Sequence, residues 1–152
     1  MTGLFPPPSD SFDVFLVEDD QAAIRLTAEA FRDAGAPVSL RAARDGEQAL
    51  AFLRADAADH RLPDLILLDL NLPRRGGLDV LAAVKNDPAL SRIPVIVMST
   101  SESASDIDRA YALRANCYIS KPVDLGEFFQ VIRLLSDFWL KTAKLPRSQA
   151  HA

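Results

Sequence analysis

Cysteine and histidine are scarce in this 152-residue chain, which has one cysteine and two histidines. Cys117 has no second cysteine with which to form a disulfide within the chain, and a zinc site made of thiolates and imidazoles is not expected. No apolar run reaches the roughly 18 residues of a transmembrane helix, and residues 1–12 lack the basic and apolar segments of a signal peptide. We therefore expect a cytoplasmic protein with no membrane contact.

Basic residues are also too few for a nucleic-acid-binding surface. The chain has 17 lysines and arginines against 21 aspartates and glutamates, a net charge of −4, whereas binding to the phosphate backbone needs a basic face. Hydrophobic residues make up 49% of the chain and charged residues 25%, as in a soluble globular domain. The length fits one domain with a full apolar core.

Short apolar runs alternate with segments of helical periodicity between residues 12 and 143. The expected strands are residues 13–17, 37–40, 65–68, 93–98 and 117–120, and the expected helices are residues 22–34, a segment opening at 45–46, 78–84, 105–115 and 125 to about 144. The first, third and fourth strands are apolar throughout, which indicates a parallel sheet buried on both faces. The pattern is (βα)5, an α/β doubly wound fold with right-handed crossovers. Residues 1–11 and 144–152 are predicted to be a flexible leader and tail.

Polar residues follow the strands at the edge where ligands of open parallel sheets bind. They are Glu18, Asp19 and Asp20 after the first strand, Asp69 after the third, Ser99 and Thr100 after the fourth and Lys121 after the fifth. Carboxylates without thiolate or imidazole suit a hard cation, Mg²⁺ or Mn²⁺. A lysine and hydroxyl groups beside them suit the oxygens of a phosphoryl group.

Five motifs in this order resemble the receiver domains of two-component response regulators. They are Glu18-Asp19, the segment from Asp45-Gly46 to Leu50, Asp69-Leu70-Asn71-Leu72-Pro73 followed by Gly77, Ser99-Thr100, and Tyr118 with Lys121-Pro122. Each motif alone is weak, but five of them at successive strand ends are specific. The resemblance covers residues 12–143 and implies a flavodoxin-like receiver, with a five-stranded sheet in the order 2-1-3-4-5.

The resemblance also implies roles for the residues of these motifs. Asp69 would accept a phosphoryl group from the phosphohistidine of a sensor kinase, so the chain would be a signalling protein and not an enzyme in the ordinary sense. Mg²⁺, or Mn²⁺ in its place, would be held by Glu18, Asp19, Asp69 and the backbone carbonyl of Asn71. The run Glu18-Asp19-Asp20 contains two candidates for the family's acidic pair, Glu18-Asp19 and Asp19-Asp20. The strand end at residue 17 favours the first pair, with Asp20 capping the next helix.

Three further residues would contact the phosphoryl group, and two residues would report its presence. Lys121, Ser99 and Thr100 would bind the phosphoryl oxygens, and Ser99 and Tyr118 would act as switch residues that shift the population of the helix 4, strand 5 and helix 5 surface. In this family the peptide bond between Lys121 and Pro122 is commonly cis.

Other segments resemble a narrower group, the single-domain regulators paired with bacterial and cyanobacterial phytochromes. They are Asn116-Cys117-Tyr118-Ile119, the loop at 57–62 and Phe138-Trp139-Leu140. The expected partner is therefore a sensor histidine kinase, with a phytochrome as one candidate. Because the motifs fill residues 12–143, we expect the output to be a protein–protein contact.

The last predicted helix has two apolar stripes where one would cover the sheet. Its core face is Phe128, Ile132, Leu135 and Trp139, and its second stripe is Val131, Leu134 and Phe138. The second stripe predicts a homodimer through helix 4, strand 5 and helix 5. The alternative is a wider core beneath the end of the helix.

Three other functions remain open at the level of sequence. A haloacid-dehalogenase-type phosphohydrolase has an Asp-x-Asp pattern, but here Asn71 takes the second place and cannot act as a general acid. A flavodoxin-like cofactor binder would carry a Ser-, Thr- or Gly-rich loop after the first strand, where the three acidic residues would repel the phosphate of FMN. An interaction module that does not use phosphate is the third.

Overall fold

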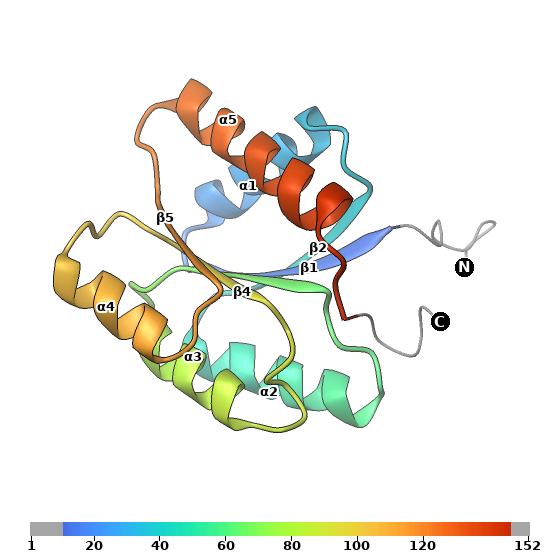
Figure 1. The fold of residues 1–152 in the computed structure, drawn as a ribbon, viewed down its shortest axis with the longest axis vertical. Coiled ribbons are helices and arrows are strands. Elements are labelled where there is room, and N and C mark those ends of the chain that lie inside the picture. Colours follow the sequence, from blue (N-terminus) through green and yellow to red (C-terminus); the bar gives the residue numbers. More distant parts are fainter. Residues whose placement is uncertain (1–10, 147–152) are drawn as a thin grey trace.

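The computed structural model describes residues 11–146 (Figure 1). Residues 1–10 and 147–152 lie outside the described part, so the leader and most of the tail stay predictions. Within residues 11–146, no helix has the length and apolar character needed to cross a bilayer.

The described residues form a central sheet of five parallel strands in the order β2-β1-β3-β4-β5. The strands are β1 (Phe12–Val17), β2 (Val38–Ala43), β3 (Leu65–Leu68), β4 (Val95–Ser99) and β5 (Cys117–Ser120). The chain winds outward from β1 in both directions, so β1 and β3 flank the switch point of the sheet. The predicted α/β fold and strand order are confirmed.

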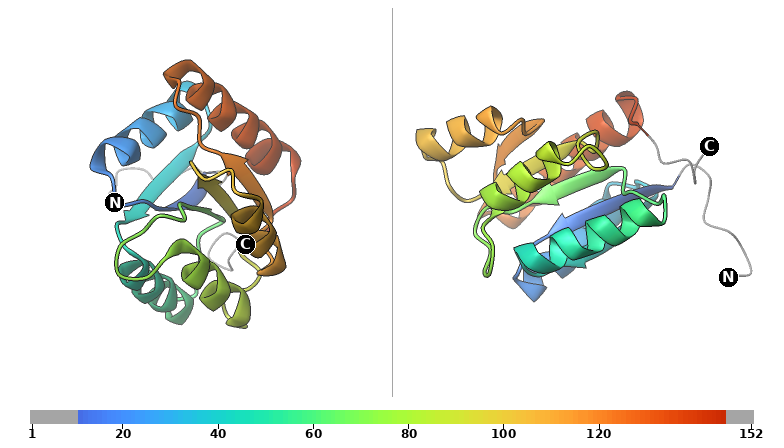
Figure 2. Two further views of the ribbon diagram at one scale, coloured as in Figure 1. Left: turned by 90° about the vertical axis from the view of Figure 1, so that its left-hand side faces the viewer. Right: turned by 90° about the horizontal axis from the view of Figure 1, so that it is seen from below.

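Helices cover both faces of the sheet (Figures 1 and 2). They are α1 (Gln21–Asp33), α2 (Gly46–Ala58), α3 (Gly77–Asn86), α4 (Ala104–Ala112) and α5 (Leu125–Leu135). Helices α1 and α5 lie side by side on one face, and α2, α3 and α4 cover the other. Asp20 caps α1, as predicted, by accepting a hydrogen bond from the backbone N–H of Ala22, and Asp45 caps α2 in the same way through the N–H of Gln48.

Two apolar cores, one on each side of the sheet, explain the unbroken apolar runs of the central strands. Along β1, Phe15 and Val17 point into the core under α2 and α3, whereas Val14 and Leu16 point into the core under α1 and α5. All four side chains are buried. Alternate residues of a strand face opposite sides of the sheet, so a strand covered on both sides must be apolar at every position.

The last helix ends close to its predicted end, but its second half is not α-helical. Helix α5 ends at Leu135 and the chain continues as a π-helical segment, Ser136–Thr142. Its i to i+5 hydrogen bonds add a residue to the turn and rotate the following side chains. Leu140, only 4% exposed, is therefore buried more deeply than Trp139, which is half-buried and packs against the same core as Phe128, Ile132 and Leu135.

Candidate functional site

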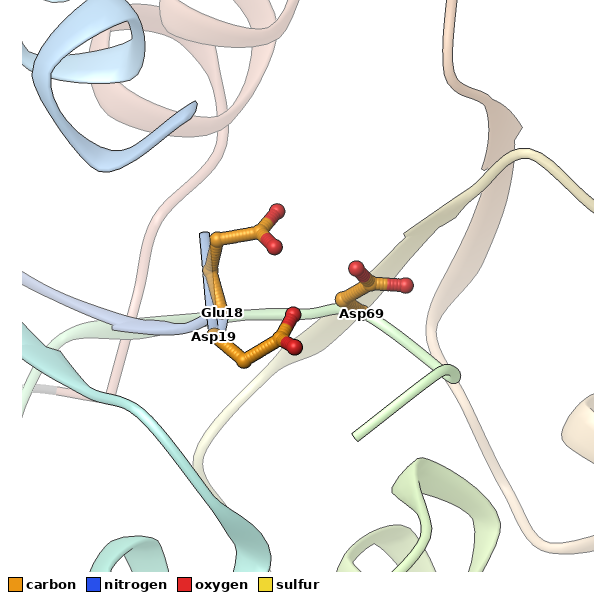
Figure 3. A group of neighbouring side chains, drawn as sticks. All are labelled: Glu18, Asp19 and Asp69. Atoms are coloured by element: carbon orange, nitrogen blue, oxygen red, sulfur yellow. The ribbon is translucent and has the colours of Figure 1, made fainter. Parts of the chain in front are cut away.

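Three carboxylates meet at the carboxyl ends of β1 and β3 (Figure 3). Glu18 and Asp19 follow β1, and Asp69 follows β3. The two strands are paired up to Val17 and Leu68, and the N–H of Asp69 donates to the carbonyl of Val17 at 3.1 Å. One oxygen from each of the three carboxylates lies within 4.8 Å of the others. An all-oxygen donor set of this kind fits Mg²⁺ or Mn²⁺.

The ammonium of Lys121 joins this cluster from the far side of β4. Its Nζ lies 2.5 Å from Oε1 of Glu18 and 3.8 Å from Oδ2 of Asp69. The backbone N–H of Lys121 donates to the carbonyl of Ser99 at 2.8 Å, so the pairing of β4 and β5 extends to this lysine and places it. Burial raises the pKa of Glu18, and the hydrogen bond and charge of Lys121 oppose that effect.

The backbone after β3 is held tightly around Asp69. Its Oδ1 accepts a hydrogen bond from the N–H of Asn71 at 3.1 Å, and the N–H of Gly77 donates to the carbonyl of Leu70 at 3.0 Å. A Cβ on Gly77 would lie 2.4 Å from the carbonyl oxygen of Asp69. Only glycine permits this close approach of α3 to the loop.

The predicted switch residues, Ser99 and Tyr118, both form hydrogen bonds with Ser101 in the loop that follows β4. Ser99 is fully buried, and its Oγ accepts the N–H of Ser101 at 3.1 Å, whereas Thr100 is exposed. The hydroxyl of Tyr118 donates to the carbonyl of Ser101 at 2.7 Å, and Oγ of Ser101 donates to Asp106 in α4 at 2.6 Å. Sequence patterns did not single out Ser101 or Asp106.

A second contact that sequence reasoning missed reaches the cluster from β2. Arg44, the first residue after that strand, donates from Nε and Nη2 to the backbone carbonyl of Asp19, at 3.2 and 2.9 Å. In the sequence, this contact is indicated only by the position of Arg44, which directly precedes Asp45-Gly46 and follows a strand that ends at the same edge of the sheet.

The expected cis peptide bond between Lys121 and Pro122 is wrong for this structure, since all peptide bonds of the described residues are trans. Trans is the intrinsically favoured form of an X-Pro bond, by about 0.5–1 kcal/mol.

The second apolar stripe of the last helix is largely exposed. Leu134 is 61% exposed and Phe138 is 54% exposed. Val131 is half-buried and packs against the core under α1 and α5. Two of the three side chains of this stripe, Leu134 and Phe138, are thus in solvent. Their part in a dimer stays a prediction.

Comparison with known proteins gives consistent matches over the described residues. Residues 14–133 match the family model described as the response regulator receiver domain. Response regulator Rcp1 of Synechocystis is 41% identical over 135 residues, which cover 88% of this chain and 92% of Rcp1.

Two solved structures are also similar. The phosphorylated cyanobacterial phytochrome response regulator RcpA is 48% identical with a TM-score of 0.84, and the match covers 90% of this chain and 99% of RcpA. The Mn²⁺-bound form of Rcp1 is 40% identical with a TM-score of 0.82, covering 89% of this chain and 99% of that one.

Proposed function

The chain belongs to the response regulator receiver family and is related to phytochrome response regulators, and from this premise we propose that Asp69 accepts a phosphoryl group from a sensor histidine kinase. One observation carries the proposal. The half-buried carboxylate of Asp69 lies beside two other carboxylates and within 3.8 Å of the ammonium of Lys121. Receiver domains are generally signalling proteins, and the proposed output is a change in protein contacts.

In the proposed reaction, a carboxylate oxygen of Asp69 attacks the phosphorus of a phosphohistidine. An O–P bond forms, the N–P bond breaks, and the imidazole nitrogen keeps the electron pair of the broken bond. The product is an acyl phosphate on Asp69. The chain supplies only the acceptor and its surroundings, so the catalysis here is positioning and charge stabilisation.

A divalent cation fits beside Asp69, and the Mn²⁺-bound structure of Rcp1 supports this. Glu18, Asp19, Asp69 and the carbonyl of Asn71 would hold it, with Glu18 acting directly or through water. When bound, Mg²⁺ would neutralise the charge that gathers on the phosphoryl oxygens. The three carboxylates repel one another without a cation, and Lys121 offsets that repulsion only in part.

Lys121, Ser99 and Thr100 are the proposed ligands of the bound phosphoryl group. Lys121 now contacts Glu18 and is within 3.8 Å of Asp69. A phosphoryl group on Asp69 would draw this ammonium away from Glu18. Ser99 would turn its hydroxyl toward the phosphoryl oxygens. Tyr118, whose hydroxyl bonds the adjoining loop, would then shift with that loop.

The partners proposed are a histidine kinase, with a phytochrome as one candidate, and a second copy of this chain. The dimer would use α4, β5 and α5 with Val131, Leu134 and Phe138. A cytoplasmic location and the lack of a nucleic-acid or membrane contact are likewise proposals, since they rest on composition and charge.

The proposal is tested by incubating the protein with acetyl phosphate and Mg²⁺ and measuring its mass. We expect one phosphoryl group on the wild type and none on Asp69→Asn, while Asp79→Asn, an exposed carboxylate on α3, should be labelled like the wild type. An unlabelled wild type would refute the proposal, and steady turnover of p-nitrophenyl phosphate would favour a phosphohydrolase. Phosphotransfer from a panel of purified kinases that includes a phytochrome would then identify the partner.

A further inference from the structure

Arg44 lies outside the motifs of the proposed site and yet binds its backbone directly. It follows Ala43, whose carbonyl accepts the N–H of Glu18 at 3.0 Å in the last step of the pairing between β2 and β1. Two N–H groups of the Arg44 guanidinium converge on the carbonyl oxygen of Asp19. The planar fork of an arginine side chain suits such a two-point contact.

The peptide unit that Arg44 contacts is held at its other end as well. The N–H of Asp20, in the same peptide unit as the Asp19 carbonyl, donates to Oε2 of Glu18 at 3.3 Å. The other carboxylate oxygen of Glu18 is bound by Lys121. The loop after β1 is thus restrained from both sides, by Arg44 at the carbonyl and by Glu18 at the N–H.

Arg44 is itself held by the start of α2. Its backbone N–H donates to Oε1 of Gln48 at 2.9 Å, and the N–H of Gln48 donates to Oδ1 of the helix cap Asp45 at 2.7 Å. The bond from Gln48 to Asp45 is that of a capping box, whereas the side chain of Gln48 accepts from the residue before the cap instead of the cap itself. This pair of bonds gives the arginine a fixed backbone from which to reach Asp19.

We infer that Arg44 is a positioning residue for the cation site, because it fixes the peptide that carries the exposed carboxylate of Asp19. The inference rests on the proposed function, since it assumes that Asp19 is a ligand. A carboxylate on a loop must lose freedom when it binds an ion, and a loop that is already restrained loses less. Groups that orient metal ligands without touching the metal typically change affinity by about 10–100-fold.

Charge and positioning predict opposite results for removal of Arg44, and this makes the inference testable. A guanidinium near the site repels a cation, so deletion of the charge alone would tighten cation binding. Loss of positioning would weaken it. Arg44→Ala should therefore bind Mn²⁺ about tenfold more weakly than the wild type, as measured from the electron paramagnetic resonance signal of free Mn²⁺.

A matched control removes the same charge from a surface position. Arg54 is exposed on α2, and Arg54→Ala should bind Mn²⁺ as the wild type does or slightly more tightly. Arg44→Lys keeps the charge but loses the fork, and it should fall between the wild type and Arg44→Ala. If Arg44→Ala does not fold, the weaker binding of Arg44→Lys at an unchanged thermal midpoint decides the question.

Labelling with acetyl phosphate separates this inference from the proposed function. In Arg44→Ala, the Mg²⁺ concentration for half-maximal labelling should rise while the rate at saturating Mg²⁺ stays close to that of the wild type. If the wild type binds Mn²⁺ and is labelled on Asp69 while Arg44→Ala keeps the same or tighter affinity, only the inference on Arg44 is overturned. A wild type that binds no Mn²⁺ overturns the inference and the metal part of the proposed function together.

Discussion

The hydroxyl of Tyr118 in β5 donates a 2.7 Å hydrogen bond to the backbone carbonyl of Ser101, in the loop between β4 and α4. The hydroxyl of Ser101 donates to Asp106 in α4, and its backbone N–H donates to the hydroxyl oxygen of Ser99. One aromatic residue of β5 is therefore tied to the loop that begins at the predicted switch serine. Movement of that loop must either carry Tyr118 along or break this bond.

Replacement of Tyr118 by phenylalanine should loosen this loop while the aromatic packing remains. We expect a loss of about 1 kcal/mol in the free energy of unfolding, the usual size of one hydrogen bond, and faster amide exchange in residues 100–103, measured by mass spectrometry. Tyr111→Phe is the matched control, because it also removes one tyrosine hydroxyl, which accepts the N–H of Tyr118 in β5. Equal exchange in the loop of both variants would contradict the assignment.

The half-buried carboxylate of Asp13, at the start of β1, should make stability depend on pH. Burial raises the pKa of Asp13 above its usual value near 3.8, and the charge of Arg41 opposes this effect without cancelling it. The folded state then holds the proton at pH values where the unfolded state has lost it. Stability from this group is present below the usual value and is lost as the pH rises through the folded pKa.

Asp13→Asn removes that dependence. Urea unfolding from strongly acid pH to neutrality should show the variant gaining stability relative to the wild type as the pH rises above the usual value for aspartate. Asp79→Asn, on the exposed first turn of α3, serves as the control for a general effect of charge. If the free energies of unfolding of Asp13→Asn and the wild type differ by the same amount at every pH in this range, a raised pKa of Asp13 in the folded state is refuted.

Much of this fold follows from where the apolar runs stop. Strands 65–68 and 117–120 have the predicted bounds. The second strand was predicted over residues 37–40, but pairing with β1 extends it to Ala43. Asp69 comes directly after the apolar run at 65–68, and Lys121 comes one position past the run at 117–119. Their meeting at one edge of the sheet was therefore also predictable from the sequence.

Contacts to backbone oxygens could not be predicted in the same way. Lys85 on α3 is nearly buried, and its Nζ donates to the carbonyls of Ser91 and Ile93 and to Oδ1 of Asn116. A lysine in an amphipathic helix is ordinarily exposed, and no residue type marks a carbonyl that points at it. The contacts of Arg44 to Asp19 and of Tyr118 to Ser101 were missed for the same reason.

The exposed stripe on α5 and the π-helical segment predicts self-association. Leu134→Glu combined with Phe138→Glu should convert a dimer at tens of micromolar into a monomer, as measured by sedimentation with and without a phosphoryl mimic. A buried interface cannot accept two unpaired carboxylates, whereas Ala51→Glu, exposed on α2, should leave the dimer intact. A wild type that sediments as a monomer under both conditions would rule out this interface.

Two adjacent glycines at the start of α3 provide a direct test of how the backbone positions Asp69. A Cβ at Gly77 would meet the carbonyl oxygen of Asp69 at 2.4 Å and Cα of Leu70 at 2.5 Å, whereas a Cβ at Gly76 has nothing within 4 Å. Neither glycine has a positive φ, so alanine is compatible with the backbone at both positions and the two variants differ in this contact. We expect Gly77→Ala to lower the free energy of unfolding by about 1–3 kcal/mol, as overpacking does.

The atoms that a Cβ at Gly77 would meet belong to the backbone of Asp69 and Leu70. The clash should therefore also displace the carboxylate of Asp69. Gly77→Ala should therefore accept a phosphoryl group from acetyl phosphate more slowly than the wild type at saturating Mg²⁺, while Gly76→Ala should match the wild type in both labelling rate and stability. The labelling is followed by intact mass under conditions where both variants are fully folded. If Gly77→Ala were destabilised but labelled at the wild-type rate, the glycine would serve packing alone, and the position of Asp69 would not depend on its contact with α3.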